Sequence, residues 1–339
     1  METTHGRLVH HEVRTNLDVS QIPLAELAAG LLAKLTASSQ GGSRFEQERC
    51  LAVLLRLQDA IESAVDTQQN RFSMSLAAVQ MKNIRYAHYK YGLPLAGAVH
   101  VDFGAGAISP AQRMFTHLML GVRQAHLVEL DPIPDVGAVL QSLARLMGET
   151  LIDPQRLFAD LPITRELILT NMRGFDFAKL RKGDLEGVDP TRLMLHSCLL
   201  ERAPIGPASV DVVVSNSVME HVPDPDAAVA AMARITRSGG FGLHGIDTID
   251  HRWYGNPSLP PFEFLTLESK ESIVHGCNRL RICDYPAIFE RHGFAVLELS
   301  QSNPLPMADE VRARLLEPWR SMPAADLLHS WGMFIVRKK

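Results

Sequence analysis

Imidazole and carboxylate side chains follow two short apolar runs in the second half of the chain. His221 comes shortly after the run at 210–215, and Asp250 and His251 come after the run at 241–246. A histidine takes up and releases protons near neutral pH, and a neighbouring carboxylate can fix the orientation of its ring. We therefore predict His221, Asp250 and His251 as candidates for acid–base catalysis, with Asp250 orienting His251. For His221, a structural role at the start of its loop is the alternative.

The same loop offers oxygen and nitrogen atoms that bind metal ions, on Asp247, Asp250 and His251. Metal sites combine such ligands at characteristic spacings, and no further ligand accompanies these three in a matching pattern. We therefore predict no metal site. A polar loop without a catalytic role is a further alternative for this segment.

A glycine-rich turn follows the first apolar run of strand length. Residues Asp102 to Gly106 read Asp-Phe-Gly-Ala-Gly. Glycine lets the backbone approach a ligand that a side chain would block, and such turns lie where ligands bind in α/β sheets. Glu129, 23 residues after Gly106 in the next apolar run, has the chemistry to bind both hydroxyls of a ribose. Asp131 is the alternative for this contact, and both acids could also be solvated strand ends.

The turn departs from the dinucleotide-binding pattern Gly-x-Gly-x-x-Gly, because Ser109 occupies the place of the third glycine. That glycine allows close packing of the following helix. The departure disfavours a nicotinamide cofactor.

Strand and helix signals alternate from residue 98 onward. Apolar runs of strand length recur at 99–103, 125–130, 193–197, 210–215, 241–246, 294–299 and 331–337. Between the fourth and fifth runs, Asp224-Pro225 marks the start of a helix and Gly239-Gly240 its end. The alternation predicts an α/β fold with a mainly parallel sheet that is covered by helices on both faces. Roughly sixty residues separate the second and third runs, which predicts a helical insertion at about 133–190.

The segment after the fourth run carries a longer motif. Residues 210–222 read Val-Asp-Val-Val-Val-Ser-Asn-Ser-Val-Met-Glu-His-Val, and Asp-Pro-Asp follows at 224–226. This block resembles the region after the fourth strand in class I, Rossmann-like methyltransferases that depend on S-adenosylmethionine (SAM). With the glycine-rich turn and Glu129, the resemblance covers about residues 98–247. It implies a seven-stranded sheet whose last strand is antiparallel, with SAM as the cofactor at the first four strand ends.

The resemblance also implies which residues hold SAM. Asp102, Gly104, Ala105 and Gly106 would surround the methionine portion and the ribose, Glu129 would bind the ribose hydroxyls, Leu130 would lie beside the adenine, and Asn216 and Ser217 would border the sulfonium. Relatives commonly carry an acid after the third strand, which accepts the adenine amino group. Cys198 and Leu199 stand at this place without a carboxylate, so they are predicted only as neighbours of the adenine.

Residues 1–95 are predicted to form an N-terminal helical lid, and residues 96–339 the SAM-binding domain. The first segment has apolar residues at helical spacing and ends in a tyrosine-rich stretch at 86–91. A sheet with both faces already covered does not need this segment for its core, so we expect it to roof the active site. Because aromatic faces attract cations, Tyr86 is predicted to contact the sulfonium. Packing of this helix on the sheet is the alternative.

Composition narrows the class of protein. Lys and Arg number 34 and Asp and Glu 38, for a formal charge of −4 without long single-sign runs, which disfavours nucleic acid and anionic membranes as partners. The chain shows neither a signal-peptide core nor an apolar run of membrane-spanning length, and its four cysteines are not closely paired. These features predict a cytoplasmic protein.

The resulting prediction is an enzyme, a SAM-dependent methyltransferase that acts on a small molecule of the kind found in secondary metabolism. One alternative is a SAM-consuming cyclase or lyase on the same fold, which would release methylthioadenosine. Another is a non-catalytic binding protein. The sequence leaves open the acceptor, the methylated atom (oxygen, nitrogen or carbon) and whether the chain forms a homodimer.

Overall fold

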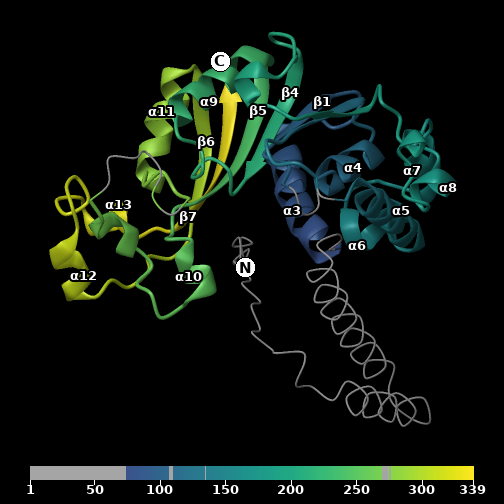
Figure 1. The fold of residues 1–339 in the computed structure, drawn as a ribbon. Coiled ribbons are helices and arrows are strands. Elements are labelled where there is room, and N and C mark those ends of the chain that lie inside the picture. The colour runs from purple at the N-terminus through teal and green to yellow at the C-terminus, as the bar shows by residue number, and fades with distance from the viewer. Residues whose placement is uncertain (1–73, 107–109, 134, 269–273, 275) are drawn as a thin grey trace, which may run out of the picture.

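The computed structural model describes residues 74–106, 110–133, 135–268, 274 and 276–339. Its centre is a seven-stranded sheet with the strand order β3-β2-β1-β4-β5-β7-β6 (Figure 1). The strands are β1 (Val99–Phe103), β2 (Gln124–Val128), β3 (Leu193–His196), β4 (Val210–Asn216), β5 (Thr236–Asp247), β6 (Phe294–Gln301) and β7 (Trp331–Lys338). Only the two pairs that include β7 are antiparallel among these strands. The predicted α/β fold with an antiparallel last strand is confirmed.

Helices fill most connections between the strands. The α-helices are α3 (Met74–Tyr91), α4 (Gln112–Met119), α5 (Val136–Ile152), α6 (Pro154–Phe158), α7 (Arg165–Asn171), α8 (Phe177–Leu180), α9 (Pro225–Ile235), α10 (Arg252–Gly255), α11 (Tyr285–Arg291), α12 (Asp309–Arg314) and α13 (Ala324–Leu327). Short 3₁₀ helices are η2 (Leu185–Gly187), η3 (Leu200–Arg202), η4 (Glu263–Thr266) and η5 (Ile282–Asp284). Among the described helices, none combines the length and the apolar character needed to cross a membrane.

Each face of the sheet has its own hydrophobic core. On one face, α3, α4 and α5 pack with strand residues that include Val212, Leu243 and Ile335. On the other face, α9 and α11 pack with Val213 and Phe334. Both cores bury strand side chains, as expected of a parallel sheet that is covered on both sides.

The helical insertion lies between β2 and β3, where residues 136–187 form α5 to α8 and η2. Figure 1 shows these helices gathered beside α4. The Asp135 side chain caps α5 by accepting from Ala138 N at 2.9 Å. The predicted insertion at about 133–190 therefore corresponds to these helices.

The helix after β4 begins as predicted but ends earlier. The Asp224 carboxylate accepts from Ala227 N at 3.0 Å, and Pro225 is the first helical residue. The helix ends at Ile235, because Thr236 already pairs with Val210 as the start of β5. The prediction that Gly239-Gly240 end the helix was therefore wrong, since both glycines lie in β5.

The described part of the predicted lid belongs to the core. Residues 1–73 lie outside the described residues, whereas α3 packs on the sheet face through Ala77, Met81, Ile84 and Ala87, each at most 2% exposed. Their spacing of three and four residues places them on one side of the helix. The expectation that the sheet does not need this segment is therefore wrong for α3.

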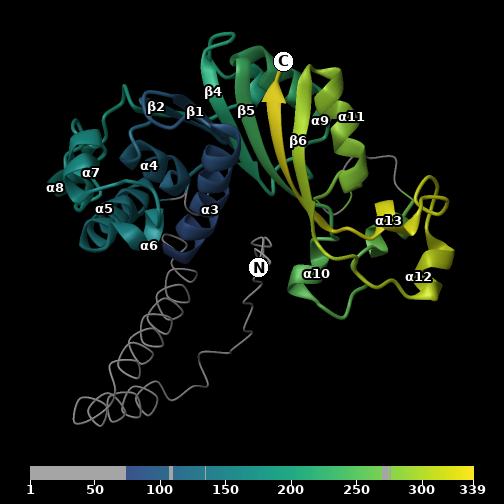
Figure 2. The same cartoon turned by 180° about the vertical axis from the view of Figure 1, so that it is seen from behind.

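A small additional layer, here called the cap, comprises described residues in 248–284 and 302–330. It has its own apolar cluster, which includes Phe262, Phe264, Leu315 and Leu327. The cap follows Asp247 and precedes Trp331, which pair at the carboxyl end of β5. Figure 2 shows α10, α12 and α13 of the cap together at this end of the sheet.

The strand order creates a switch point between β1 and β4. From β1 the chain builds β2 and β3 on one side, and then returns to place β4 on the other. The connections after β1 and β4 therefore part at the carboxyl edge, which is where open α/β sheets bind ligands.

Candidate functional site

The glycine-rich turn after β1 packs tightly on two neighbouring segments. The N–H groups of Gly104 and Ala105 donate to Val128 O at 2.9 and 3.3 Å. At Gly104 (φ +70°), a Cβ would lie 2.2 Å from a methyl group of Val218 in the loop after β4. At Gly106 (φ +80°), a Cβ would meet none of the described residues within 4 Å. Gly104 is therefore required for packing, whereas Gly106 presents an open backbone to a ligand.

The carboxylate of Glu129 lies directly on this turn. Its Oε2 accepts a hydrogen bond of 2.5 Å from Gly106 N, and its Oε1 accepts from Leu130 N and Asp131 N at 2.7 and 3.0 Å. The side chain of Asp131 is exposed. The structure thus brings Glu129 and Gly106 together and favours Glu129 over Asp131 as the acid that faces the turn.

A buried ion pair supports the turn from below. Arg113, in the first turn of α4, donates to Oδ1 of Asp102, whose side chain is 1% exposed. Burial raises the pKa of Asp102 to about 6, although Arg113 acts in the opposite direction. Arg113 was not among the residues predicted from the sequence. A cation at the start of a helix opposes the helix dipole, and this was the available signal for a fixed anionic partner.

The loop after β4 borders the same edge. Asn216 is exposed at the end of β4, and Ser217 (φ +52°) donates its N–H to Gly245 O at 2.8 Å. A small cavity of about 30 Å³ between α3 and β4 is lined by residues that include Asn216 and Arg113. Asn216 therefore lies near the ion pair under the glycine-rich turn.

Two exposed leucines follow neighbouring strands farther along this edge. Leu130 after β2 is 60% exposed and Leu199 after β3 is 40% exposed. Cys198 is half-buried and packs against the core beneath α9. The three predicted adenine neighbours therefore lie on adjacent loops and expose apolar surface.

Two imidazoles face each other beyond the ends of β4 and β5. The ring centroids of His221 and His251 are 4.7 Å apart in an edge-on arrangement. The Nδ1–H of His221 donates to Gly276 O, and Nε2 of His251 lies 3.9 Å from Oδ2 of Asp247. Burial lowers the pKa of His251, against the opposing effect of Asp247. A neutral imidazole at this place can accept a proton or bind a cation.

Asp250 does not orient His251, which corrects the sequence-based prediction. The Asp250 carboxylate is fully buried and accepts from the guanidinium and the N–H of Arg252 and from Phe264 N. These contacts hold the start of the cap. Asp247 is the acid beside His251 instead, and it also accepts from the hydroxyl of Tyr254.

Glu220 is an unusual neighbour of His221. Its side chain is 1% exposed, and neither carboxylate oxygen has a hydrogen-bond partner within the part of the chain that the structure describes. Burial raises its pKa well above the ordinary value. From the sequence, Glu220 could be recognised only as part of the motif at 210–222, because the burial of its carboxylate depends on the packing of the cap.

Tyr86 is not placed at the glycine-rich turn, which corrects a second prediction. Its hydroxyl donates to Glu298 on β6 at 2.9 Å, and Lys90 also donates to Glu298. Strand register places Glu298 in the same row as Asp102 but four strands away, which is about 19 Å at the usual strand spacing. The Glu298 carboxylate on β6 attracts these donors, so the tyrosine-rich stretch serves packing on the sheet.

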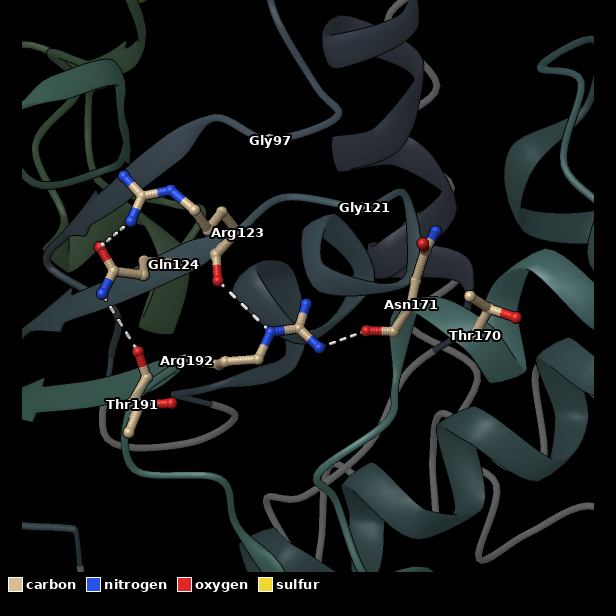
Figure 3. Close-up of a pocket in the computed structure, with 8 residues that line it drawn as sticks. All are labelled: Gly97, Gly121, Arg123, Gln124, Thr170, Asn171, Thr191 and Arg192. Atoms are coloured by element: carbon tan, nitrogen blue, oxygen red, sulfur yellow. Dashed lines mark hydrogen bonds between the residues drawn. The ribbon is translucent and has the colours of Figure 1, made fainter.

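A second pocket lies at the opposite edge of the sheet. Its volume is about 490 Å³, and its lining includes Gly97 before β1, Gln124 at the start of β2, and Arg192 before β3. Figure 3 shows the Arg192 guanidinium directed at backbone carbonyls, among them Arg123 O at 3.3 Å. The Arg192 guanidinium is thus already bound by backbone carbonyls. The pocket also lies far from the glycine-rich turn, so it is separate from the candidate site.

Comparison with known proteins finds similarity to methyltransferases. Residues 174–243, which hold β3, β4, α9 and most of β5, match the family described as "Methyltransferase domain". Ubiquinone biosynthesis O-methyltransferase of Cupriavidus pinatubonensis is 29% identical over 120 residues, which are 33% of this chain and 48% of that protein. The chain thus spans about half the length of this curated relative. The resemblance to methyltransferases predicted from the sequence is confirmed for this part of the chain.

Solved structures of methyltransferases resemble the chain more remotely. Geranyl diphosphate C-methyltransferase from Streptomyces coelicolor A3(2) has 13% identity and a TM-score of 0.42, covering 76% of this chain and 79% of that one. The arsenic(III) S-adenosylmethionine methyltransferase of Chlamydomonas reinhardtii has 16% identity and a TM-score of 0.38, covering 72% and 64%. Scores at this level support neither a particular site nor a particular substrate.

Proposed function

We propose that the chain transfers a methyl group from SAM to a small organic acceptor at the carboxyl edge of the sheet. The observation that carries this proposal is the contact between Gly106 N and Glu129 Oε2 beside an open backbone. A paired acid and glycine turn at the switch point is the arrangement that binds the ribose of a nucleoside cofactor.

SAM would then extend along the edge from β4 to β3. The turn from Asp102 to Gly106 would hold the methionine portion, with Glu129 on the ribose hydroxyls. Leu130, Cys198 and Leu199 would line the adenine, while Asn216 and Ser217 would border the sulfonium. The two carboxylates of Asp102 and Glu129 favour a cationic ligand at this edge, and Arg113 balances one of them.

The acceptor would bind between the sulfonium and the pair formed by His221 and His251. Its nucleophilic atom would attack the methyl carbon while the carbon–sulfur bond breaks, leaving S-adenosylhomocysteine and one released proton. Alignment of the reacting atoms is the main contribution of a protein to such a displacement, and is worth about 7–11 kcal/mol. The two imidazoles are the groups placed to bind the acceptor or to take its proton.

Two measurements test the proposal. Isothermal titration should show binding of S-adenosylhomocysteine, and incubation with SAM and hydroxylated small molecules should yield S-adenosylhomocysteine and a methylated product. Hydroxyl acceptors come first because the curated relative is named as an O-methyltransferase. Methylthioadenosine as the product would indicate a cyclase or lyase, and the absence of any binding would contradict a SAM site altogether.

A further inference from the structure

We propose that His221, His251 and Cys277 form a binding site for one Zn²⁺ ion at the carboxyl edge of the sheet. The sequence-based prediction of no metal considered only ligands within one loop, whereas these three residues come from three separate segments. The site itself stands on its own geometry, and its role toward an acceptor rests on the proposed function.

The ligand atoms are already close together. One ring nitrogen of each histidine and the sulfur of Cys277 lie within 4.8 Å of one another. His221 follows β4, His251 follows β5, and Cys277 closes a short bridge with Val274 in the cap. Tetrahedral zinc with bonds of about 2.0–2.3 Å would draw these atoms about 1 Å closer, which side-chain rotation can supply.

The two imidazoles have the orientation of metal ligands. Nδ1–H of His221 donates to Gly276 O, which leaves Nε2 as the free ligand atom. A ring N–H bound to a backbone carbonyl is the usual support of a metal-binding histidine. Nε2 of His251 is buried and has no hydrogen-bond partner among the described residues, so a cation would satisfy an atom that they leave unpaired.

Backbone contacts hold the segments in place without a metal. Asn278 N donates to Glu220 O at 2.7 Å, and the Asn278 side-chain amide donates to Met219 O and Val222 O at 2.8 and 3.0 Å. Cys277 and Val274 exchange backbone hydrogen bonds of 2.9 and 3.0 Å. The loop that carries His221 is therefore fastened to the segment that carries Cys277.

Charge also favours a cation at this place. Cys277 is 1% exposed, and its thiol donates weakly to Ile249 O at 3.7 Å. The neighbouring Glu220 is buried with both oxygens unpartnered, and a buried carboxylate without a partner is unstable as an anion. A divalent ion at this place would stabilise the charged forms of both groups, the thiolate of Cys277 and the carboxylate of Glu220.

The donor set selects the kind of metal. Two imidazoles and one thiolate suit Zn²⁺, whereas Mg²⁺ and Ca²⁺ prefer oxygen ligands. Three protein ligands leave a fourth position open, as in catalytic zinc sites. His221 lies at the exposed side of the cluster. Zinc there could bind an acceptor hydroxyl or thiol and lower its pKa, so that neither histidine would need to take the proton.

Substitution of Co²⁺ for Zn²⁺ in the full chain tests the site. Titration of metal-free protein with Co²⁺ should saturate at one equivalent and produce a thiolate-to-cobalt charge-transfer absorption. Because a cysteine binds metal as the thiolate, binding must release the thiol proton of Cys277, and affinity should rise with pH. Zn²⁺ should displace the cobalt and remove the absorption.

Matched variants assign the ligands. Cys277→Ser should abolish the charge-transfer band, whereas Cys283→Ser, at a half-buried cysteine outside the cluster, should retain it. His251→Ala should weaken Co²⁺ binding by more than about 100-fold, since even outer partners of metal sites contribute about 10–100-fold. S-adenosylhomocysteine binding serves as the independent measure of folding and of the cofactor site.

Some outcomes would overturn the site. Wild-type protein that binds S-adenosylhomocysteine but gives no thiolate band with Co²⁺ would rule out the zinc site and leave the proposed function standing. An unchanged band in Cys277→Ser would also rule it out. A normal band in protein that does not bind S-adenosylhomocysteine would support the zinc site while contradicting the proposed function.

Discussion

The backbone N–H of Gly106 donates a hydrogen bond of 2.5 Å to Oε2 of Glu129, 23 residues farther along the chain. The contact joins the turn after β1 to the end of β2, which run parallel with Phe103 opposite Val128. Because Oε1 is held by the N–H groups of Leu130 and Asp131, the carboxylate has a fixed orientation. A ligand with two neighbouring hydroxyls would meet an acceptor that is already positioned.

Removing this carboxylate should weaken cofactor binding. We expect Glu129→Ala to reduce the affinity for S-adenosylhomocysteine by about 1.5–3 kcal/mol, the range for hydrogen bonds to a charged group. Asp131→Ala is the matched control, since that side chain is exposed, and should change the affinity little. Isothermal titration measures both. A larger effect at Asp131 than at Glu129 would show that Asp131, and not Glu129, contacts the ribose.

The two glycines of the turn should respond differently to alanine. Gly106→Ala adds a methyl group in open space, so we expect it to lower the affinity for S-adenosylhomocysteine more than tenfold, with a stability loss of about 1–2 kcal/mol from its positive φ. Gly92→Ala carries a similar strain (φ +73°) with equally open surroundings, away from the turn, and should lose only stability.

Gly104→Ala should lose more stability than either variant, because its Cβ would lie 2.2 Å from Val218. We expect a further penalty of about 1–3 kcal/mol from overpacking, measured by chemical denaturation. Equal stability of the Gly104 and Gly106 variants would show that the loop after β4 does not pack on the turn as described.

The sequence could predict the parts of the site that strand order alone determines. The ends of parallel strands meet at one edge of the sheet. Recognising β1 and β2 as neighbours is therefore enough to predict that Gly106 and Glu129 lie close together. Asn216 reached the same edge for the same reason. Side-chain direction beyond the strand ends was not predictable in this way. Asp250 turns away from His251 because its donors, Arg252 and Phe264 N, come from the cap.

The cap itself left little trace in the sequence. Its helices have three to six residues, too short for a recognisable hydrophobic period. It is organised around Arg281, which is fully buried and donates to Leu327 O at 2.9 Å and His329 O at 3.0 Å. A buried arginine bound only to distant carbonyls cannot be told from a surface arginine by spacing. The grouping of His221 with Cys277 depends on this cap.

The corrected position of Tyr86 leads to a third prediction. Tyr86→Phe removes a hydroxyl that donates to Glu298 at 2.9 Å, so we expect the free energy of unfolding to fall by about 1–2 kcal/mol. Affinity for S-adenosylhomocysteine should remain within twofold, because the hydroxyl lies four strands from β1. Tyr89→Phe, at a 55% exposed tyrosine that donates to Asp160 O, should change stability less. If Tyr86→Phe lost affinity for S-adenosylhomocysteine without losing stability, Tyr86 would instead contact the cofactor.

A pair of buried histidines contributes to the pH dependence of stability. Nε2–H of His100 donates to Pro94 O at 3.0 Å, so its Nδ1 accepts from Nδ1–H of His117 at 3.0 Å. Nε2 of His117 is buried without a partner. Burial lowers the pKa of His100 to about 4 and that of His117 well below its usual value. Both rings therefore stay neutral in the folded protein at mildly acidic pH, at which histidines of the unfolded chain are already protonated.

The fourth prediction follows from the sign of these shifts. Below a pH of about 6.5, these histidines take up protons in the unfolded chain but not in the folded protein. The free energy of unfolding therefore falls as the pH decreases. The loss is about 2 kcal/mol per buried histidine between pH 6.5 and pH 5. His117→Asn keeps a donor near the position of Nδ1 but cannot be protonated, so the difference in unfolding free energy between pH 7.5 and pH 5 should narrow by about that amount. Asp102, whose pKa is raised to about 6, acts with the opposite sign but equally in both proteins, and therefore cancels.

His88→Asn, at a half-buried histidine of α3, is the control for the substitution itself. Guanidinium denaturation at the two pH values gives the comparison, and an unchanged difference in His117→Asn would show that the buried pair does not govern acid stability.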